Sequence, residues 1–364
     1  MWFSFRLTSF LTLNYRCPLH MVELLLLFEM ASAAKIPIFV LFLLSLQQSA
    51  LSAFQFPCFF IFGDSLIDNG NNNQLITKVK VDYRPYGIDF PQGPTGRFTN
   101  GKNTVDILAK FLGFDTYIPP FATAQGEDIL KGVNYGSGSA GIRSETGQQL
   151  GDRISLSRQL LNHYLTVSQI TNLLGNDFSA KKHLGKCLYY FVIGSNDYLN
   201  NYNIPEYYPT SSQYTPDEYA TVLIQQYSQQ LKTLYSYGAR KISVSGLGPL
   251  GCIPASLARG SNGTACVDRV NDAVDLFNEK LKILVKDLNK NLTDAQFIFI
   301  NAISMMPAEL FALVSNTTGQ CIPGETPCLI RALHAFYDNF HPTEIVNKVA
   351  ATVAYLEIQK LILR

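Results

Sequence analysis

The hydroxyl of Ser65 is a candidate nucleophile because the residues before it predict a strand that ends at this serine. Residues 59–62 are apolar and lie between Pro57 and Gly63, a pattern typical of a short strand buried on both faces. In open α/β sheets, ligands bind at the carboxyl ends of the strands. A turn serine is the plainer alternative, since Gly-Asp-Ser followed by an asparagine-rich run is also ordinary turn chemistry.

Asp338 and His341 stand three residues apart, just before the last predicted helix. Pro342 favours an extended conformation of His341, and Thr343 is placed to cap the helix that follows. A lone histidine is more often structural than catalytic. A serine hydroxyl becomes a good nucleophile, however, when an imidazole takes its proton and a carboxylate holds the other imidazole nitrogen. These residue types therefore admit nucleophilic catalysis and leave the structural alternative open.

The scaffold that would bring these residues together is predicted from alternating strand and helix patterns. Short apolar runs predict strands at residues 59–62, 132–135, 188–193, 241–245 and 296–300. Apolar spacing and capping residues predict helices at residues 103–112, 155–174, 215–238 and 267–290, and after Thr343. This alternation favours a mostly parallel sheet covered on both faces, in a single domain.

Other strand ends carry residues that suit a binding site. Small residues at 136–141 let a ligand approach the backbone, and Gly-Ser-Asn-Asp follows a predicted strand at 194–197. Residues 246–251 match the Gly-x-Gly-x-x-Gly fingerprint of dinucleotide-binding proteins. That fingerprint needs a helix to open at its third glycine, which Pro249 and Pro254 oppose. The sequence therefore does not favour a nucleotide cofactor.

The overall composition gives no indication of a nucleic-acid, membrane-surface or metal partner. The chain has 364 residues, a formal net charge of +1 and no acidic or basic block. Nothing in it indicates binding to nucleic acid or electrostatic capture by a membrane. No Cys-x-x-Cys pair and no cysteine–histidine cluster has zinc spacing, so the sequence predicts no metal site.

Residues 1–53 are predicted to be processing sequence rather than part of the fold. Residues 36–46 form an apolar stretch after Lys35, and residues 50–53 offer small side chains for cleavage, as in a secretory signal peptide. We expect the signal to start at Met30 and the residues before it to be an upstream extension. The apolar stretch is shorter than the roughly 18 to 20 residues that span a bilayer, which argues against a retained anchor. Residues 54–364 are expected to form the single domain.

Glycosylation motifs favour secretion independently of the leader. Asn-x-Ser/Thr triplets begin at Asn262, Asn291 and Asn316. One such triplet is common by chance, but all three are consistent with passage through the secretory route. We therefore expect sugar at these asparagines.

The cysteines also suit an oxidising compartment. Removal of the leader takes Cys17 from the seven cysteines and leaves an even number. Two expected pairs, Cys252 with Cys266 and Cys321 with Cys328, would close short loops, and Cys58 and Cys187 each precede a predicted strand. These pairings are expectations among several connectivities that the sequence allows.

Seven blocks of the sequence, in this order, resemble the plant GDSL esterase/lipase family of the SGNH hydrolases. They lie at residues 62–66, 85–90, 94–98, 132–135, 194–198, 246–252 and 338–344. Each block is weak by itself, but the ordered set spans nearly all of residues 57–360 and is specific.

The resemblance implies an α/β fold and assigns roles to the candidate residues. The fold is a three-layer α/β/α sandwich of the flavodoxin-like SGNH hydrolase type, with a five-stranded parallel sheet. Ser65 matches the nucleophile, His341 the general base and Asp338 the carboxylate that orients it. The backbone N–H groups of Ser65 and Gly138 and the side-chain amide of Asn196 match the oxyanion hole. No cofactor and no metal are implied.

The function implied is that of a secreted, extracellular serine esterase or lipase whose partner is an acyl ester or lipid substrate. Acyl transfer to an alcohol by the same triad is an alternative. The family carries a longer segment between Phe311 and Cys321, with a Gly-Cys-Cys sequence, and its shortening here raises a third possibility, a noncatalytic glycoprotein. The sequence indicates neither the acyl chain length nor the oligomeric state.

Overall fold

A parallel sheet forms the centre of the fold, in a computed structural model that describes residues 55–260, 266–302 and 320–362. Its strands are β1 (Phe59–Gly63), β2 (Leu188–Val192), β3 (Lys241–Ser245) and β4 (Gln296–Ile300). They lie side by side in sequence order, with Phe59 opposite Leu188 and Lys241 opposite Gln296. Phe54–Arg364 forms one compact unit around this sheet. The predicted leader lies outside the described residues.

The strand predicted at residues 132–135 is the one difference from the expected five-stranded sheet within the described chain. Residues 133–137 run beside β1, and the N–H groups of Tyr135 and Ser137 donate to the carbonyls of Ile61 and Gly63. The pairing amounts to an isolated bridge, so the sheet has four strands. Gly132, with φ of 126°, bends the chain where a regular strand would begin. Because the chain leaves β1 outward to this segment and then returns to β2, the end of β1 is the switch point of the topology.

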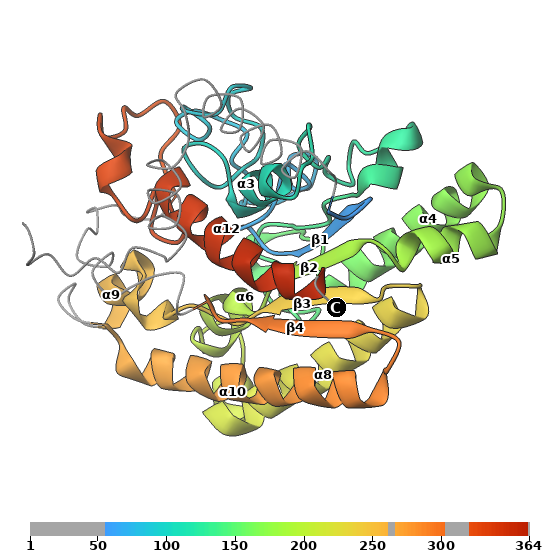
Figure 1. Ribbon diagram of the computed structural model, residues 1–364. Coiled ribbons are helices and arrows are strands. Elements are labelled where there is room, and N and C mark those ends of the chain that lie inside the picture. The colour runs from blue at the N-terminus through green and yellow to red at the C-terminus, as the bar shows by residue number, and fades with distance from the viewer. Residues whose placement is uncertain (1–54, 261–265, 303–319, 363–364) are drawn as a thin grey trace, which may run out of the picture. The chain divides into compact units, whose positions relative to one another are not determined.

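Helices cover both faces of the sheet (Figure 1). On one face, α3 (Thr104–Phe111) packs with α12 (Glu344–Ile358) over Phe59, Ile61 and Tyr190. On the other face lie α4 (Leu156–Leu174), α5 (Asp177–Leu184), α8 (Pro216–Ser236) and α10 (Asp268–Asn291). Successive side chains of a strand point in turn into the cores on the two faces of the sheet, so both faces of the strand must be apolar.

Shorter elements connect these layers at the carboxyl edge of the sheet. They are α6 (Ser195–Asp197), a π-helical turn (Tyr198–Tyr202), α7 (Thr210–Gln213) and α9 (Pro254–Gly260). The 3₁₀ turns are Gly126–Lys131, Gln148–Leu150, Leu250–Cys252, Arg331–Leu333 and Gln359–Leu361. Among the described residues, no helix is both long and apolar enough to cross a membrane.

One of the two capping signals that the sequence predicts is confirmed. Thr215 and Glu218 form the predicted capping box at the start of α8, with Pro216 at its first position. Thr343 is the N-cap residue of α12, but its hydroxyl donates to the carbonyl of His334 and does not cap the helix. The side chain of Asn100 accepts from the N–H of Glu344 instead. The prediction of a Thr343 side-chain cap was therefore wrong.

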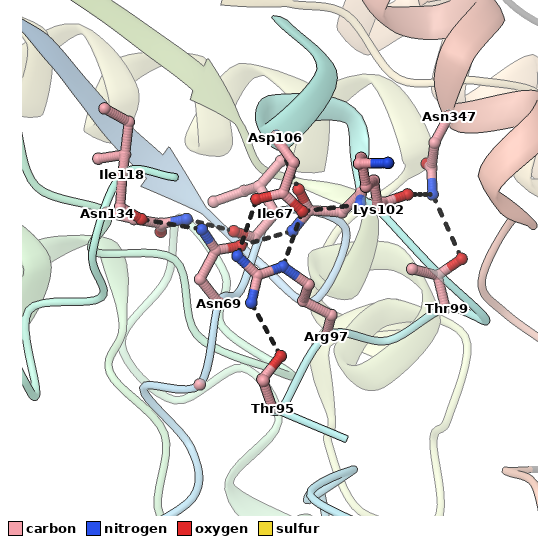
Figure 2. A network of polar contacts seen from close by, with 12 residues as sticks. Ile67, Asn69, Thr95, Arg97, Thr99, Lys102, Asp106, Ile118, Asn134 and Asn347 are labelled. Atoms are coloured by element: carbon pink, nitrogen blue, oxygen red, sulfur yellow. Dashed lines mark hydrogen bonds and ion pairs between the residues drawn. The ribbon is translucent and has the colours of Figure 1, made fainter. Parts of the chain in front are cut away.

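A buried ion pair fixes the start of α3 (Figure 2). The guanidinium of Arg97 makes two hydrogen bonds to the Asp106 carboxylate, at 2.7 and 2.8 Å, and a third to Thr95. Asp106 also accepts from the N–H of Asn103, while the Asn103 side chain caps Asp106 in return. The Arg97–Asp106 pair therefore links the segment between β1 and α3 to α3 itself, which packs on one face of the sheet.

We predict that Asp106→Ala lowers the free energy of unfolding by about 3 to 5 kcal/mol, because it leaves the buried Arg97 charge without its carboxylate partner. Denaturant unfolding followed by fluorescence would measure the loss. Asp128→Ala is the matched control, since it removes the exposed pair with Lys131 and should cost less than about 1 kcal/mol. Equal losses in the two variants would contradict the prediction.

Candidate active site

The structure brings Ser65, His341 and Asp338 together although they come from opposite ends of the chain. The Ser65 Oγ lies 2.8 Å from His341 Nε2. His341 Nδ1 lies 2.8 and 2.9 Å from the two carboxylate oxygens of Asp338. A carboxylate only accepts, so Nδ1 carries the proton and Nε2 is free to accept the Ser65 proton. This order of contacts suits a general base beside a nucleophile.

Ser65 is held at the switch point by the turn that follows β1. The Gln159 side chain brackets the last strand residue, because it accepts from the N–H of Gly63 and donates to its carbonyl. The Asp68 carboxylate accepts from the N–H groups of Gly70 and Asn71 and so closes the next turn. Ser65 therefore sits on a loop whose two ends are both fixed by buried side chains.

The Asp338–His341 loop is rigid for local reasons. The carboxylate of Asp338 accepts from the N–H groups of Phe340 and His341, each at 2.8 Å. Tyr337 N–H donates to the His341 carbonyl across the base of the loop. Burial of Asp338 favours a higher pKa, but the charge of His341 and hydrogen bonds from His341 and Tyr86 outweigh it and hold the pKa below its ordinary value. Asp338 is thus ionised at neutral pH.

Asn196 and Gly138, two of the residues predicted for the oxyanion hole, differ in whether a hydrogen-bond donor remains for a ligand. Asn196 lines the same pocket as Ser65, its amide nitrogen donates to the Ala140 carbonyl at 3.0 Å and its amide oxygen accepts from Asn200. One amide proton remains for a ligand. The structure does not support the role predicted for Gly138, because its N–H donates to the buried Asp68 carboxylate at 3.0 Å.

Ser139, which sequence reasoning missed, occupies the position beside Gly138 that faces the pocket. It is the third residue of a turn closed by Ala140 N–H on the Ser137 carbonyl, and its φ is +61°. Such a turn favours glycine at that position. Among described residues, neither the Ser139 N–H nor its hydroxyl has a hydrogen-bond partner, and Ser139 lines the pocket.

The pocket at Ser65 has a volume of about 370 Å³ and a mostly apolar lining. Its polar residues include Ser65, Asn196, Asn200 and His341. Its apolar residues come mainly from β2, the 246–253 loop, the loop before α12 and α12 itself, and include Tyr190, Val192, Leu247, Pro249, Ile253, Phe336, Phe340, Val346 and Ala350. The glycine-rich block at 246–251 therefore forms a wall of this pocket, and its third glycine lies in a 3₁₀ turn.

Three buried carboxyls surround the site. Burial raises the pKa of Asp64 to about 7, against a hydrogen bond from Leu66 N–H and the nearby charge of His341. Burial likewise raises the pKa of Asp68 and of Asp197 to about 6, although each accepts several backbone or side-chain hydrogen bonds. Asp64 Oδ2 has no partner among the described residues, so this carboxyl is the easiest to protonate.

The cysteines confirm two of the three expected pairings. Disulfides join Cys58 to Cys187 and Cys252 to Cys266. The third pairing was wrong: Cys321 and Cys328 are free thiols, with Cys321 Sγ turned toward the Tyr337 carbonyl and Cys328 exposed. Cys58 and Cys187 also lie beside His183, in a group whose spacing would suit a metal, but both sulfurs are engaged in the disulfide.

The sequons can be placed in part. Asn291 is the last residue of α10 and is exposed, as a glycosylated asparagine must be. Asn262 and Asn316 lie outside the described residues.

Comparison with known proteins identifies the family. The model of the GDSL-like lipase/acylhydrolase family matches residues 59–353. The chain belongs to this family. Its class is therefore that of hydrolases acting on ester bonds.

Three GDSL esterase/lipase proteins of Arabidopsis thaliana are similar over most of their length. At1g29670 is 51% identical over 83% of this chain and 87% of its own. At4g18970 is 49% identical over 82% and 88%, and At1g29660 is 50% identical over 83% and 87%. The expected α/β fold of this family is thus confirmed, with the strand count corrected above.

The raised pKa of Asp64 predicts a pH dependence of stability. Between its ordinary value of 3.8 and about 7, the folded protein keeps a proton that the unfolded chain has lost. This contribution to stability is complete below pH 3.8 and is lost as the pH rises through about 7, by roughly 4 kcal/mol in total. Asp64→Asn keeps an acceptor for Leu66 N–H and should flatten the profile. Denaturant unfolding at several pH values checks this, and an equally steep loss in both proteins would contradict it.

Proposed function

We propose that the protein is a secreted serine esterase or lipase that hydrolyses acyl esters with Ser65 as nucleophile, His341 as general base and Asp338 as the orienting carboxylate. The observation that carries the proposal is the unbroken series of contacts from Ser65 Oγ through the imidazole to Asp338. Membership of the ester-hydrolase family supports the reaction class.

The proposed reaction has two halves. Ser65 Oγ gives its proton to His341 Nε2 as its oxygen forms a bond to the ester carbonyl carbon. The tetrahedral intermediate then expels the alcohol, which takes the proton from the imidazolium, and leaves an acyl group on Ser65. Water repeats the same steps and releases the acid. Asp338 stays ionised throughout and stabilises the imidazolium, in keeping with its lowered pKa.

We assign the oxyanion hole to the N–H groups of Ser65 and Ser139 and to the Asn196 amide. All three residues line one pocket, and neither backbone N–H donates to another described residue. Ser139 replaces Gly138 in this assignment because the Gly138 N–H is already used by Asp68. Donors fixed in advance are worth most when charge develops on the carbonyl oxygen.

The shape of the pocket favours an apolar acyl group. Much of its lining is built from aliphatic and aromatic side chains of β2, the 246–253 loop, the loop before α12 and α12. An alkyl chain placed there gains roughly 0.8 kcal/mol for each buried methylene. We therefore propose that the acyl chain lies along this wall and that the alcohol faces solvent.

Secretion is part of the proposal. The leader predicted at residues 1–53 supports it from the sequence. The two disulfides and the exposed sequon at Asn291 suit an oxidising, extracellular compartment.

We predict that Ser65→Ala abolishes hydrolysis of a short-chain aryl ester and labelling by a fluorophosphonate probe. The fold should persist, because the side chain lies at a loop edge and, among described residues, its hydroxyl hydrogen-bonds only to the imidazole. Activity assays, mass spectrometry of the labelled serine and thermal unfolding measure these outcomes. Turnover by the variant at the wild-type rate would refute the role of Ser65, and an unlabelled wild type would favour the noncatalytic alternative.

Asn196→Ala tests the oxyanion assignment. We expect kcat to fall by about 10² to 10³ with little change in KM, since the contact strengthens in the transition state. Steady-state kinetics at saturating ester separates the two constants. An unchanged kcat would make Asn196 a turn residue only.

A further inference from the structure

Tyr86 touches the catalytic carboxylate from a part of the chain that lies 252 residues before it. Its hydroxyl donates to Asp338 Oδ2 over 2.5 Å, and its side chain is fully buried. Hydrogen bonds to an ionised acceptor are shorter and stronger than neutral ones. The contact is therefore a strong hydrogen bond, because it is short and buried.

The two oxygens of Asp338 both contact the imidazole of His341 but differ in their other partners. Oδ1 accepts from the backbone N–H groups of Phe340 and His341, which come with the loop itself. Oδ2 accepts from the imidazole and from Tyr86. Without the phenol, the imidazole would be the remaining described partner of Oδ2. The plane of the carboxylate is thus fixed from outside its own loop by Tyr86.

Tyr86 is itself held in place. Its oxygen accepts from the N–H of Cys321 at 3.2 Å, so the phenol proton points away from that N–H and toward Asp338. The rings of Tyr83, Phe98 and Tyr337 meet the Tyr86 ring at steep angles. Burial and the charge of Asp338 raise the pKa of Tyr86 far above its ordinary value. The phenol therefore remains a donor over the whole working pH range.

We propose that Tyr86 is a positioning residue for the reaction: it holds the Asp338 carboxylate in the plane and the charge state that align His341 with Ser65. The inference rests on the proposed function of these three residues. Cys321 belongs to the same chain of contacts, because its backbone N–H orients the phenol.

The consequence is a measurable effect on proton affinity. The groups that face Asp338 and can titrate are Tyr83, Tyr86, Cys321, Tyr337 and His341, and Asp64 lies near the imidazole. Of these, Tyr86 and His341 donate to the carboxylate through their side chains. Removing the phenol takes one hydrogen bond from the negatively charged Asp338 carboxylate. The coupled Asp338–His341 pair then binds the proton that it takes up at low pH more tightly.

Tyr86→Phe in the full chain tests the proposal, with Tyr337→Phe as matched control. Tyr337 is a buried tyrosine of the same aromatic cluster, but its hydroxyl donates to the Pro85 carbonyl. We expect Tyr86→Phe to lower kcat and the rate of fluorophosphonate labelling about tenfold with KM unchanged. The acid limb of kcat/KM should move to higher pH by up to about 1 unit. Tyr337→Phe should keep the wild-type profile.

A second variant guards against misfolding of the first. Replacement of Tyr86 by 3-fluorotyrosine keeps the shape and makes the phenol a better donor, so the acid limb should move to lower pH. Wild-type rates and pH profiles in both Tyr86 variants would overturn the inference and leave the proposed function intact. Equal effects of Tyr86→Phe and Tyr337→Phe would also overturn it, because they would indicate loss of packing. Failure of the wild-type protein to label at Ser65 would overturn the proposed function and the inference together.

Discussion

The cost of leaving buried polar groups unpaired governs most of the carboxyl edge of the sheet, where Asp64 Oδ2 and the Ser139 hydroxyl are exceptions. Much of the chain that turns there is buried, and an unpaired buried amide or carbonyl would cost about 1 to 3 kcal/mol. Asp68, Asn71 and Asn134 meet this need, because their side chains bond the backbone of neighbouring loops. The asparagine-rich run after Ser65 therefore joins neighbouring loops through side-chain hydrogen bonds, and these hydrogen bonds hold Ser65 in position.

The catalytic groups depend on two loops that are fixed in different ways. The Ser65 loop is tied to segment 95–106 by hydrogen bonds of Asn69 with Asn103 and of Asn73 with Thr95, and to Gly138 through the Asp68 carboxylate. Within segment 95–106, the Arg97–Asp106 ion pair holds the start of α3 (Figure 2). The Asp338–His341 loop is short and closed by its own backbone, and it is joined to the Ser65 side of the site through Tyr86 and His341. Two separately rigid loops that meet at one imidazole explain how residues from the two ends of the chain share one geometry.

Sequence patterns predicted the parts of this structure that arise from local rules. Four buried strands, the α8 capping box and the Ser65, Asp338 and His341 candidates all came from apolar runs, caps and ordered motifs. The strand at 132–135 was overpredicted, because Gly132 bends the backbone where apolar spacing alone suggests pairing. Gly138 was assigned to the oxyanion hole from the family resemblance, because only the fold reveals that the Asp68 carboxylate accepts from its N–H. Tyr86 lies in the family-like block at residues 85–90, but nothing local indicates its role, since its partner lies far away in sequence. Cys321 and Cys328 were paired on loop length, a criterion that says nothing of which way each sulfur faces.

The disulfide between Cys58 and Cys187 has a consequence for engineering this protein. Each cysteine immediately precedes its strand, so the bond ties β1 to β2 at the amino end of the sheet. It closes 129 residues of chain, a loop for which the chain-entropy model gives a stabilisation of about 5 kcal/mol. The loops that line the pocket all emerge from the opposite end. Substrate preference can therefore be redesigned by exchanging those loops, while the disulfide, remote from the chemistry, keeps the strands in register. The same disulfide makes an oxidising host the natural choice for producing such variants.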